Sequence, residues 1–580
     1  MPADSWLLKD ADPTQITMLA RDLGVSALFA RLLLVRGVPD AAAARRFLGQ
    51  DPSLLDPWEL PGMEAAAGRL LDALDAGERI VVYGDYDADG VTSTALLYSY
   101  LRRAGYNVTY FLPHRFEDGY GMNLHAVEEL ADHGARLIVT VDNGVSSVRE
   151  VAHAQDLGMD VIVTDHHTPP AILPQPFAML NPRLGGCPAE MSGLAGVGVA
   201  FALAAALEQR SPSQGVEDLL DLVAIGSIAD VAPLTGVNRT LVTAGLHRIA
   251  TATRPGIRAL ADVAGVASIA NMGAQDIGFR IGPRINAAGR MDHPEVALKL
   301  LLAEDGGEAE TLAAELERLN RLRQETSKRI EAEAHAMVAA EVDLARAAVI
   351  VLAKDDWHRG IIGIVAARLV DAYQLPVILL GADGDKWKGS GRSPEAIHLF
   401  AALEACREHL DRFGGHAQAA GLALELDRLE AFRERLDAAV RTQTGGDRPQ
   451  GPLMLDAEVS LAQVTPQLIR ELLWLEPTGQ GNPEPRLVLR RVQVLRQKQR
   501  GKDKNHLWLE LRDGIEIREA VGFGMGALFP VPEVVDVAFT PEFNFWQGQA
   551  RVQMRLHAVF PASVAPFATP GGTRAVQDPR

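Results

Sequence analysis

Cysteine, positive charge and long apolar runs are all scarce in this chain of 580 residues. Its only cysteines, Cys187 and Cys406, exclude a disulfide framework and a cysteine zinc cage within one chain. No window reaches the ~18 uninterrupted apolar residues of a membrane span, and the start MPADSWLLKDADPTQ is acidic where a secretion signal is basic. We therefore expect a cytoplasmic protein without a membrane partner.

The shortage of positive charge gives a formal net charge of -18. This balance excludes a protein that coats nucleic acid by bulk electrostatics, because phosphate binding needs Lys and Arg to displace counterions. A confined basic track stays compatible with it. The acidic surplus also suits metal sites, which use carboxylates as ligands.

Strand-like and helix-like segments alternate from Arg79 onward: RIVVY, VTSTALLYSYLRRAGY, NVTYFL, LHAVEELADHG, RLIVTV, SSVREVAHAQDLG and DVIVT. This alternation predicts an α/β fold with a parallel, doubly wound sheet. Such a sheet hosts many functions, so function has to come from its residues.

Further along, the pattern changes twice. Residues 306–344 interleave apolar and charged positions without proline, which predicts a long connecting helix. After a second, smaller α/β unit, RLVLRRVQVLRQ, HLWLELRDG, IEIREAVGFG, VVDVAFTPEFNFW and ARVQMRLHAVF are short alternating strands, which predict a β-barrel or sandwich.

These changes predict a multidomain chain, because 580 residues exceed what one hydrophobic core organises. The predicted division is an N-terminal helical extension (1–50), a catalytic domain (51–305), the connecting helix (306–344), the smaller α/β domain (345–448), the barrel domain (449–561) and a flexible tail (562–580).

The strongest local motif is GDYDADG, in which Asp85, Asp87 and Asp89 follow a strand and precede a helix. Three carboxylates this close repel one another unless a cation is present. An EF-hand would need a glutamate at its twelfth position and a preceding helix, whereas this chain has Leu96 and a strand. The end of a parallel strand is also where ligands bind, so the motif indicates a metal site.

Two further strand ends add VDNG, with Asp142, and TDHH, with Asp165, His166 and His167. Singly, such an Asp is more often a helix N-cap and such a His pair a polar loop; their convergence on one rim favours a site. Neighbouring extended side chains diverge, so one histidine would bind metal and the other would face phosphate.

Asp230, in LVAIGSIADVAPL, follows an apolar helix, and a ligand and a turn residue fit it equally well. Aspartates with one imidazole suit manganese or magnesium, and this many carboxylates fit two ions. Two such ions can promote in-line displacement at phosphorus, which predicts phosphoester hydrolysis.

Taken in order, GDYDADG, VDNG, TDHH and GSIADVAPL resemble the four motifs of the DHH phosphoesterase superfamily. The segments GFRIGPRINAAGRMDHP, WHRGIIGIVAARL, GSGRS, FGGHAQAAGL and GQGNPEP are similar to its bacterial RecJ family in particular. The resemblance runs from about Gly84 to the barrel.

This resemblance implies a 5'-to-3' exonuclease that acts on single-stranded DNA in repair and recombination and releases 5' mononucleotides. It implies two manganese ions, with magnesium as the alternative, and no nicotinamide or flavin. Asp87, Asp89, Asp142, His166 and Asp230 match the metal ligands. His167 matches a residue at the phosphate, Asp85 and Asp165 match supporting residues, and Asp142 also counts as catalytic. A helicase and a single-strand-binding protein are the partners considered.

Candidate contacts to the strand lie in four segments. Arg280, Arg284 and Arg290 would hold backbone phosphates through their planar guanidinium groups, with Asn286 beside them. The alternative is that these residues only stabilise a structural loop. Arg115, in PHRFEDGYG, would receive the 5' end. Glycine-rich turns of the smaller domain would bring N–H groups to phosphate; their candidates are Lys388, Ser390, Gly391, Arg392, Gly414, Gly415 and His416.

The barrel has the local basic track: eight basic residues and one acidic residue lie between Arg486 and Lys504. With Trp508, Phe543, Phe545 and Trp546 nearby, it predicts an OB-fold that binds single strands by charge and base stacking. Core packing is at least as good an explanation for each ring, because alternation does not show which face is buried, and Trp508 is the stacking candidate.

Two alternatives remain. Another DHH enzyme, such as an oligoribonuclease, cyclic-dinucleotide phosphodiesterase or pyrophosphatase, would share the metal chemistry but would not need a basic barrel. A non-catalytic scaffold, such as the inactive relative in the eukaryotic replicative helicase, would lack metal ligands, whereas every expected ligand is present in this chain.

Overall fold

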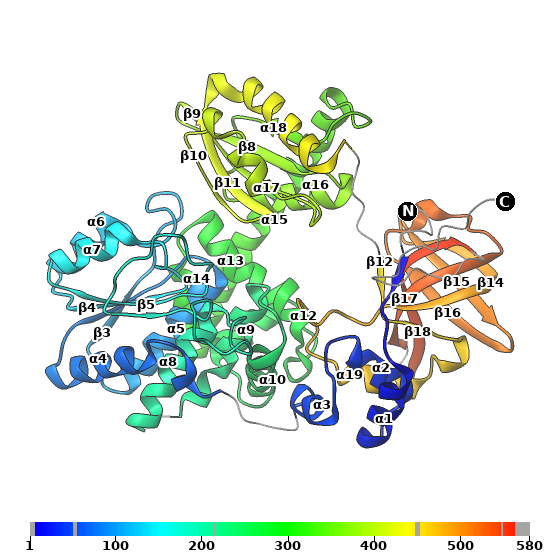
Figure 1. The fold of residues 1–580 in the computed structure, drawn as a ribbon, viewed down its shortest axis with the longest axis horizontal. Coiled ribbons are helices and arrows are strands. Elements are labelled where there is room, and N and C mark those ends of the chain that lie inside the picture. The colour runs from blue at the N-terminus through cyan, green and yellow to red at the C-terminus, as the bar shows by residue number, and fades with distance from the viewer. Residues whose placement is uncertain (1–5, 50–54, 213–214, 447–452, 547–548, 563–580) are drawn as a thin grey trace.

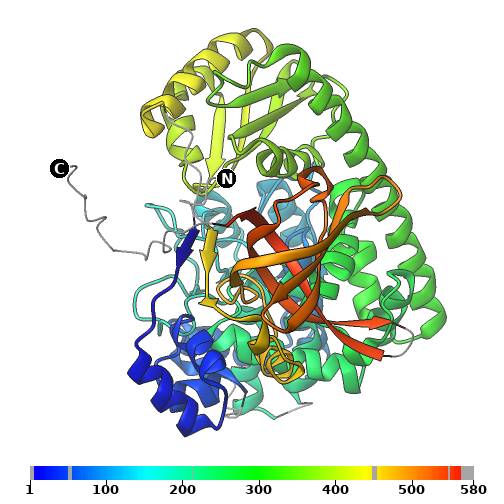
Figure 2. The same ribbon diagram turned by 90° about the vertical axis from the view of Figure 1, so that its right-hand side faces the viewer.

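The computed structural model describes all residues except 1–5, 50–54, 213–214, 447–452, 547–548 and 563–580. The predicted tail therefore lies almost wholly outside the described residues. Three lobes are visible in Figure 1, with the long helix α15 (Gly306–Glu341) joining two of them, as Figure 2 shows from the side. The predicted connecting helix is confirmed and ends three residues earlier. The domain boundaries stay predictions.

The first lobe contains a five-stranded parallel sheet in the order β3-β2-β4-β5-β6. Its strands are β2 (Ile80–Tyr83), β3 (Val108–Phe111), β4 (Leu137–Val141), β5 (Asp160–Thr164) and β6 (Ala178–Leu180). Successive residues of β2 alternate between two cores: Ile80 and Val82 enter one, whereas Val81 and Tyr83 enter the other. Both faces are therefore covered, which confirms the doubly wound prediction.

Helices cover the two faces unequally. The smaller core lies under α6 (Leu124–Asp132) and α7 (Val148–Asp156). The larger core extends into a helical layer, which contains α4 (Met63–Ala76), α5 (Ala88–Arg103), α8 (Gly196–Arg210), α9 (Leu220–Ala229), α10 (Gly236–Thr251), α11 (Pro255–Val263), α12 (Ala274–Asp276), the π-helix η5 (Ile277–Ile281), α13 (Gly282–Met291) and α14 (Glu295–Leu302).

The second lobe is a mixed sheet in the order β10-β11-β9-β8-β7, in which only β7 and β8 pair in parallel. Its elements are β7 (Ile350–Ala353), α16 (Ile362–Tyr373), β8 (Val377–Asp383), β9 (Lys386–Arg392), α17 (Leu399–Glu404), β10 (Arg412–Gly415), β11 (Ala419–Glu425) and α18 (Leu429–Thr444).

The third lobe contains a closed barrel, because β14 pairs with both β15 and β17 in the cyclic order β14-β15-β16-β18-β17. This five-stranded closure confirms the OB-fold. Its strands are β14 (Leu487–Arg500), β15 (His506–Asp513), β16 (Glu516–Gly522), β17 (Val534–Trp546) and β18 (Gln549–Pro561), preceded by β12 (Leu453–Leu455), β13 (Ala457–Glu458) and α19 (Pro466–Leu473).

The N-terminal segment packs on this barrel rather than standing apart (Figure 1). It contains a strand, β1 (Trp6–Leu8), that pairs in parallel with β12, and three helices, α1 (Pro13–Leu23), α2 (Ala27–Leu34) and α3 (Ala41–Phe47). Phe29 and Leu33 of α2 share one core with Phe539 of the barrel. The described N-terminal segment and the barrel thus form one packed unit.

Arg239 of α10 joins this unit to the first lobe. It is 5% exposed, and its guanidinium donates five hydrogen bonds to main-chain carbonyls. One acceptor is Phe47, and the others are the four consecutive residues 474–477 before the barrel. All five guanidinium donors can therefore be satisfied at this junction without a carboxylate.

Among the described residues, no helix combines the length and apolarity needed to cross a bilayer.

Candidate metal centre and nucleic-acid cleft

The predicted metal-binding residues meet at one edge of the parallel sheet. Chain order reverses there, because β3 lies on one side of β2 and β4 lies on the other. Such a switch point leaves a crevice at the carboxyl ends of the strands, where α/β proteins bind ligands. Asp85 and Asp87 follow β2, Asp142 follows β4 and His166 follows β5. We call this cluster, with Asp89, His167 and Asp230, the acidic centre.

Distances within the acidic centre are those of a ligand cage. The Nε2 atom of His166 lies 3.1 Å from Oδ1 of Asp142, 3.7 Å from Oδ2 of Asp89 and 3.8 Å from Oδ2 of Asp230. Three overlapping groups have all their potential ligand atoms within 4.8 Å of one another: Asp89 with His166 and Asp230, Asp85 with Asp87 and Asp142, and Asp142 with His166 and His167. Asp142 and His166 are each shared by two groups.

Unsatisfied buried atoms identify this cage as a cation site. Oδ1 of Asp85, Oδ1 of Asp142 and Nε2 of His166 are buried without a hydrogen-bond partner among the described residues. Burial, together with repulsion from neighbouring aspartates, raises the pKa of Asp142 well above its usual range. A bound cation would supply the missing partner and oppose this repulsion, so the donor set fits hard divalent metals.

Main-chain groups fix the orientation of two carboxylates. Asp89 accepts hydrogen bonds from the N–H groups of Gly196, at 2.7 Å, and Val197, at 2.8 Å, at the N-terminus of α8. A Cβ atom at Gly196 would lie 2.8 Å from Asp142, so only glycine allows this approach. Asp142 itself has φ of 63°, a conformation that is strained for a non-glycine residue and common at functional sites.

The two histidines differ, as expected from their divergent directions. Burial, with the nearby charge of His167, lowers the pKa of His166 to about 4, which keeps its ring neutral. Burial acts the same way on His167, but its Nδ1 lies 2.8 Å from Oδ1 of Asp165, and this carboxylate outweighs burial and raises the pKa of His167 to about 9. His167 is also the more exposed ring. The protonated ring of His167 can therefore donate a hydrogen bond.

Asp165 and Tyr120 form the surroundings of His167. Asp165 also accepts hydrogen bonds from the N–H groups of Val145, at 2.9 Å, and His166, at 2.7 Å, so it braces two loops of the centre. The Tyr120 hydroxyl lies 3.1 Å from Nδ1 of His167 and was not singled out from the sequence. Nothing in the spacing of PHRFEDGYG separates Tyr120 from an ordinary turn residue.

Three predicted arginines come together beside the centre. We call Arg115, Arg290 and Arg392 the arginine cluster. The Arg115 guanidinium lies 4.7 Å from the ring centre of Tyr86, between Asp85 and Asp87 in the chain. Burial and the charge of Arg115 lower the pKa of Arg290 to about 10, and the same causes lower the pKa of Arg392. Among the described residues, none of the three pairs with a carboxylate, so the cluster has the charge of an anion site.

Three other candidates of the Arg280–Arg290 segment have structural contacts. Nε of Arg284 donates to Glu317 of α15 at 2.8 Å, and Nη1 of Arg280 donates to the carbonyl of Gly265 at 3.0 Å. Oδ1 of Asn286 accepts from the N–H of Ala88 at 3.0 Å and so braces the GDYDADG loop. Strand binding by these three stays a prediction.

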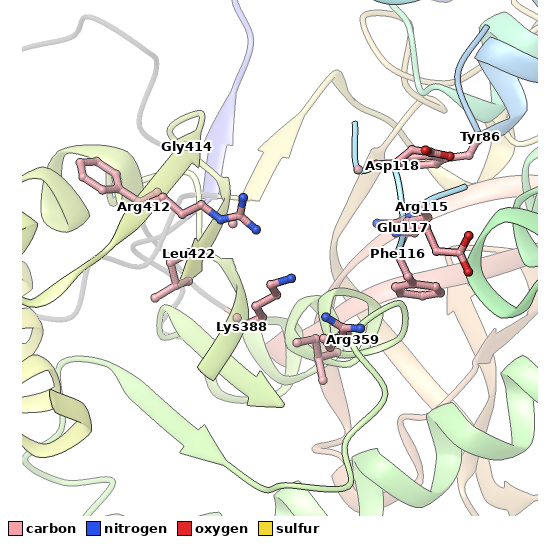
Figure 3. A pocket seen from close by; sticks show the side chains of 15 residues that line it. Tyr86, Arg115, Phe116, Glu117, Asp118, Arg359, Lys388, Arg412, Gly414 and Leu422 are labelled. Carbon is pink, nitrogen blue, oxygen red and sulfur yellow. The ribbon is translucent and has the colours of Figure 1, made fainter. Parts of the chain in front are cut away.

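A cleft of about 540 Å³ opens between the first two lobes and continues from Tyr86 and Arg115 across to β9, β10 and β11 (Figure 3). Lys388 and Gly414 line it, as predicted for a wall facing the strand. Arg359 and Arg412 also line the cleft, but neither is among the contacts predicted from the sequence. Arg359 belongs to WHRGIIGIVAARL, one of the segments that resemble the family. Ser390, Gly391, Gly415 and His416 lie on the same strands or directly after them.

Base stacking by the barrel aromatics stays a prediction, and the structure shows the surroundings of two rings of the barrel. Trp508 is only 7% exposed, with Nζ of Lys498 4.1 Å from its ring centre and Arg500 at 5.5 Å. The ring supports these cations rather than offering an open face for a base. Phe523 is 57% exposed and lies edge-on to His506 at 5.4 Å. The side chains of Phe545 and Trp546 lie outside the described residues.

Family comparisons match all three lobes. The DHH family N-terminal domain matches residues 79–227, the DHHA1 domain 346–442 and the RecJ OB domain 455–558. The chain is 37% identical over 558 residues to the single-stranded-DNA-specific exonuclease RecJ of Bacillus subtilis, which covers 95% of this chain and 70% of that protein. It belongs to the RecJ family.

Two more relatives support this assignment. The RecJ exonuclease of Escherichia coli is 38% identical over 563 residues, covering 92% of this chain and 96% of that protein. The crystal structure of RecJ from Thermus thermophilus in complex with Mn2+ superposes with a TM-score of 0.85 at 33% identity, covering 99% of this chain and 81% of that one. The RecJ arrangement of DHH, DHHA1 and OB domains thus extends over nearly the whole chain.

Proposed function

We propose that this chain is a single-stranded-DNA-specific 5'-to-3' exonuclease that releases 5' mononucleotides by two-metal hydrolysis, and that it acts in DNA repair and recombination in the cytoplasm. The observation that carries the proposal is the acidic centre, with its unsatisfied buried oxygens, beside an arginine cluster that forms no ion pair among the residues that the structure describes. Similarity to proteins named single-stranded-DNA-specific exonucleases supports the choice of substrate.

Asp87, Asp89, Asp142, His166 and Asp230 would hold two manganese ions, or magnesium in their place. When bound, such ions supply Lewis acidity at phosphorus and an activated water. The relatives from Thermus thermophilus are described in complex with Mn2+ and with Mg2+, which supports this choice of metals. Asp85 and Asp165 would support the site, Asp85 through its shared group with Asp87 and Asp165 through the hydrogen bonds that orient His167.

His167 would donate a hydrogen bond to a non-bridging oxygen of the scissile phosphate. Its partner Asp165 keeps the ring protonated at neutral pH, so the donated bond is charge-assisted. The arginine cluster would hold the 5'-terminal phosphate, because none of its three guanidinium groups forms an ion pair with a carboxylate in the described part of the chain, and together they favour a dianion. This contact would limit the enzyme to strands that present an end.

The barrel would hold the strand on its 3' side. Arg496, Lys498 and Arg500 alternate along β14, so their side chains share one face of the barrel. Charge on this face and the exposed ring of Phe523 suit sequence-independent binding of a single strand. A helicase and a single-strand-binding protein are the proposed suppliers of unpaired DNA.

The test is digestion of one oligonucleotide labelled at its 5' or 3' end, with manganese and with chelator. We expect immediate release of a 5'-labelled mononucleotide with manganese, late release of the 3' label, and no release with chelator. Early release of the 3' label would reverse the polarity. Release of neither label, with stoichiometric metal bound, would favour a small-substrate DHH activity, whereas a protein that binds no manganese would be a scaffold.

A further inference from the structure

Where β9, β10 and the middle of β11 border the cleft, one face of the second sheet carries cationic and small side chains. Ser390 on β9 pairs with Gly421 on β11, and Gly421 pairs with Gly414 on β10. In the neighbouring row, Lys388 pairs with Ala423, which pairs with Arg412. Residues directly opposite each other and residues two apart share a face of a sheet. Lys388, Ser390, Arg392, Arg412, Gly414 and Gly421 therefore form a single surface, here called the cationic sheet face.

The glycines of this face are not required by the fold. Neither Gly414 nor Gly421 has a positive φ. A Cβ atom at Gly414 would meet nothing within 4 Å, and one at Gly421 would meet only the Gly389 carbonyl at 4.0 Å. Gly415 is the contrast, because its φ is 138° and a Cβ there would lie 2.3 Å from the Ala419 carbonyl. Glycine weakens a strand, and it often marks the close approach of a ligand.

Three cations extend the cleft beyond the arginine cluster. Arg359 and Lys388 both pair with Asp383, Arg359 through Nη1 at 2.5 Å from Oδ1. Arg412 is exposed and forms no ion pair among the described residues. Figure 3 shows Arg412, Lys388 and Arg359 one after another along the wall that faces Arg115 and Asp118. We call these three residues the outer cations; one carboxylate partner leaves them a net positive charge.

Two carboxylates lie on the opposite wall, so the positive charge of the whole cleft comes from the arginine cluster together with the outer cations. Glu117 and Asp118 line it, but Oδ2 of Asp118 accepts the main-chain N–H of His114 at 2.6 Å and stays within its own loop. A single terminal phosphate would be satisfied by the arginine cluster alone. The outer cations and the open glycine floor provide room and charge for more anionic groups on the same end.

We propose that the cleft accepts strands with a 5'-terminal diphosphate or triphosphate, holding the first phosphate at the arginine cluster and the outer phosphates against Arg359, Lys388 and Arg412. The inference rests on the proposed function. The outer phosphates would displace Asp383 from its two partners.

The first cut on such a strand is an ordinary hydrolysis. The water oxygen bonds to the phosphorus of the second nucleotide, the bond from that phosphorus to the 3' oxygen of the first nucleotide breaks, and the 3' oxygen takes up a proton. The products are one nucleoside 5'-triphosphate and a strand with a 5'-monophosphate. Every later turnover releases a mononucleotide.

The experiment compares one DNA sequence with a 5'-hydroxyl, a 5'-monophosphate or a 5'-triphosphate, under single-turnover conditions with manganese, and identifies the first product by mass spectrometry. We expect the triphosphate end to be cut at least as fast as the monophosphate end, with release of a nucleoside triphosphate. Arg412→Ala should lower the triphosphate-to-monophosphate rate ratio about tenfold, the effect of one charge-assisted hydrogen bond. Asp383→Asn should raise the ratio, because it frees two cations.

Two further variants sharpen the experiment. Gly414→Val would place a side chain on the floor of the cleft, and we expect it to lower the ratio while the thermal transition stays unchanged. Arg433→Ala is the matched control, because Arg433 is an arginine of the same lobe that pairs with Glu430 and does not line the cleft. It should leave the ratio as in the parent chain.

Contradicting outcomes are distinct. If Arg412→Ala slows all three strands equally, the outer cations contact internal phosphates and the inference fails. It also fails if the triphosphate strand resists the parent enzyme while the monophosphate strand is digested. If no strand is cut, the proposed function fails instead.

Discussion

The acidic centre and the Arg239 junction both bury charge, but they treat it in opposite ways. At the junction, five carbonyls satisfy one guanidinium that is 5% exposed. At the acidic centre, buried atoms of Asp85, Asp142 and His166 have no hydrogen-bond partner among the described residues. Unpaired buried polar groups are costly, so a protein keeps them where a ligand completes them. Folding alone supplies the hydrogen-bond partners at the junction, whereas the acidic centre needs a bound metal to supply them.

The largest expected effect concerns chemistry at the acidic centre. Asp142→Asn removes a charge shared by two ligand groups, so the rate of strand digestion should fall at least ~10³-fold. The same change relieves repulsion between buried carboxylates and should raise the thermal transition of the metal-free protein. Digestion rates and calorimetry with chelator measure the two effects. A variant that is inactive and also less stable would argue for a structural role of Asp142.

The junction should respond in the opposite sense. Arg239→Ala removes five hydrogen bonds and leaves the carbonyls of Phe47, Trp474 and Glu476 without their side-chain donor, so it should destabilise the protein by about 3 kcal/mol or more. Asn482 still donates to the carbonyls of Leu475 and Pro477. Manganese affinity, measured by calorimetric titration at a temperature where the variant is folded, should not change.

Arg248→Ala is the control for this change, because Arg248 lies on the same helix and forms a half-exposed ion pair with Asp218 at 2.8 Å. Such pairs contribute about 0–1 kcal/mol. Equal shifts in the thermal transition for Arg239→Ala and Arg248→Ala would remove the distinction between a saturated buried arginine and an ordinary one.

A third prediction uses pH. Burial, with repulsion from neighbouring aspartates, raises the pKa of Asp89 to about 7 and that of Asp230 to about 8, whereas an unfolded aspartate titrates near ~3.9. Between these values the folded state binds more protons than the unfolded state. The stability of the metal-free protein should therefore fall as pH rises from about 5.5 to 8.

Thermal melts across this pH range, with chelator and with manganese, measure the effect. Manganese should raise the transition more at pH 8 than at pH 5.5, because ligands must lose protons to bind it. Asp142→Asn should flatten the pH dependence of the metal-free protein. A transition that rises with pH in chelator would contradict the assigned direction of these pKa shifts.

We expect the smallest change in DNA binding for substitutions on the barrel, because its charged side chains are exposed to solvent and need no further partner. Lys498→Gln should weaken binding of single-stranded DNA a few-fold and reduce the slope of log K against log salt by about 0.7, because one phosphate contact is lost. Lys299→Gln is the control, because Lys299 is an exposed residue of α14 in the first lobe. Identical slopes for both variants would remove the β14 face from the binding surface.

The sequence predicted the acidic centre well because each of its residues follows a recognisable element. GDYDADG, VDNG and TDHH mark strand ends, and parallel strands bring their ends to one edge. Asp230 could not be decided in this way, since a residue after a helix has no fixed direction. In the structure Asp230 directly follows α9, and its Oδ2 lies 3.8 Å from Nε2 of His166.

Other features depend on contacts that no local pattern encodes. From the sequence, Arg239 is indistinguishable from any other helical arginine. Its hydrogen-bond acceptors are residue 47 and residues 474–477, which lie far from it in the chain. Alternation along β15 places Trp508 on a face but cannot say that Lys498 covers its ring. Likewise, the spacing of Arg284 and Arg290 does not reveal that Glu317 engages only the first.

The shared core of the N-terminal helices and the barrel has a consequence for biosynthesis. Phe29 and Leu33 leave the ribosome early, but their partners Leu487 and Phe539 are more than 400 residues later in the chain. At common elongation rates, these apolar side chains wait roughly 20–100 s for their packing partners. The catalytic lobe can fold during this interval, while the first helices stay exposed to chaperones. Translation speed and chaperone supply should therefore govern the yield of this protein more through its first 48 residues than through its active site.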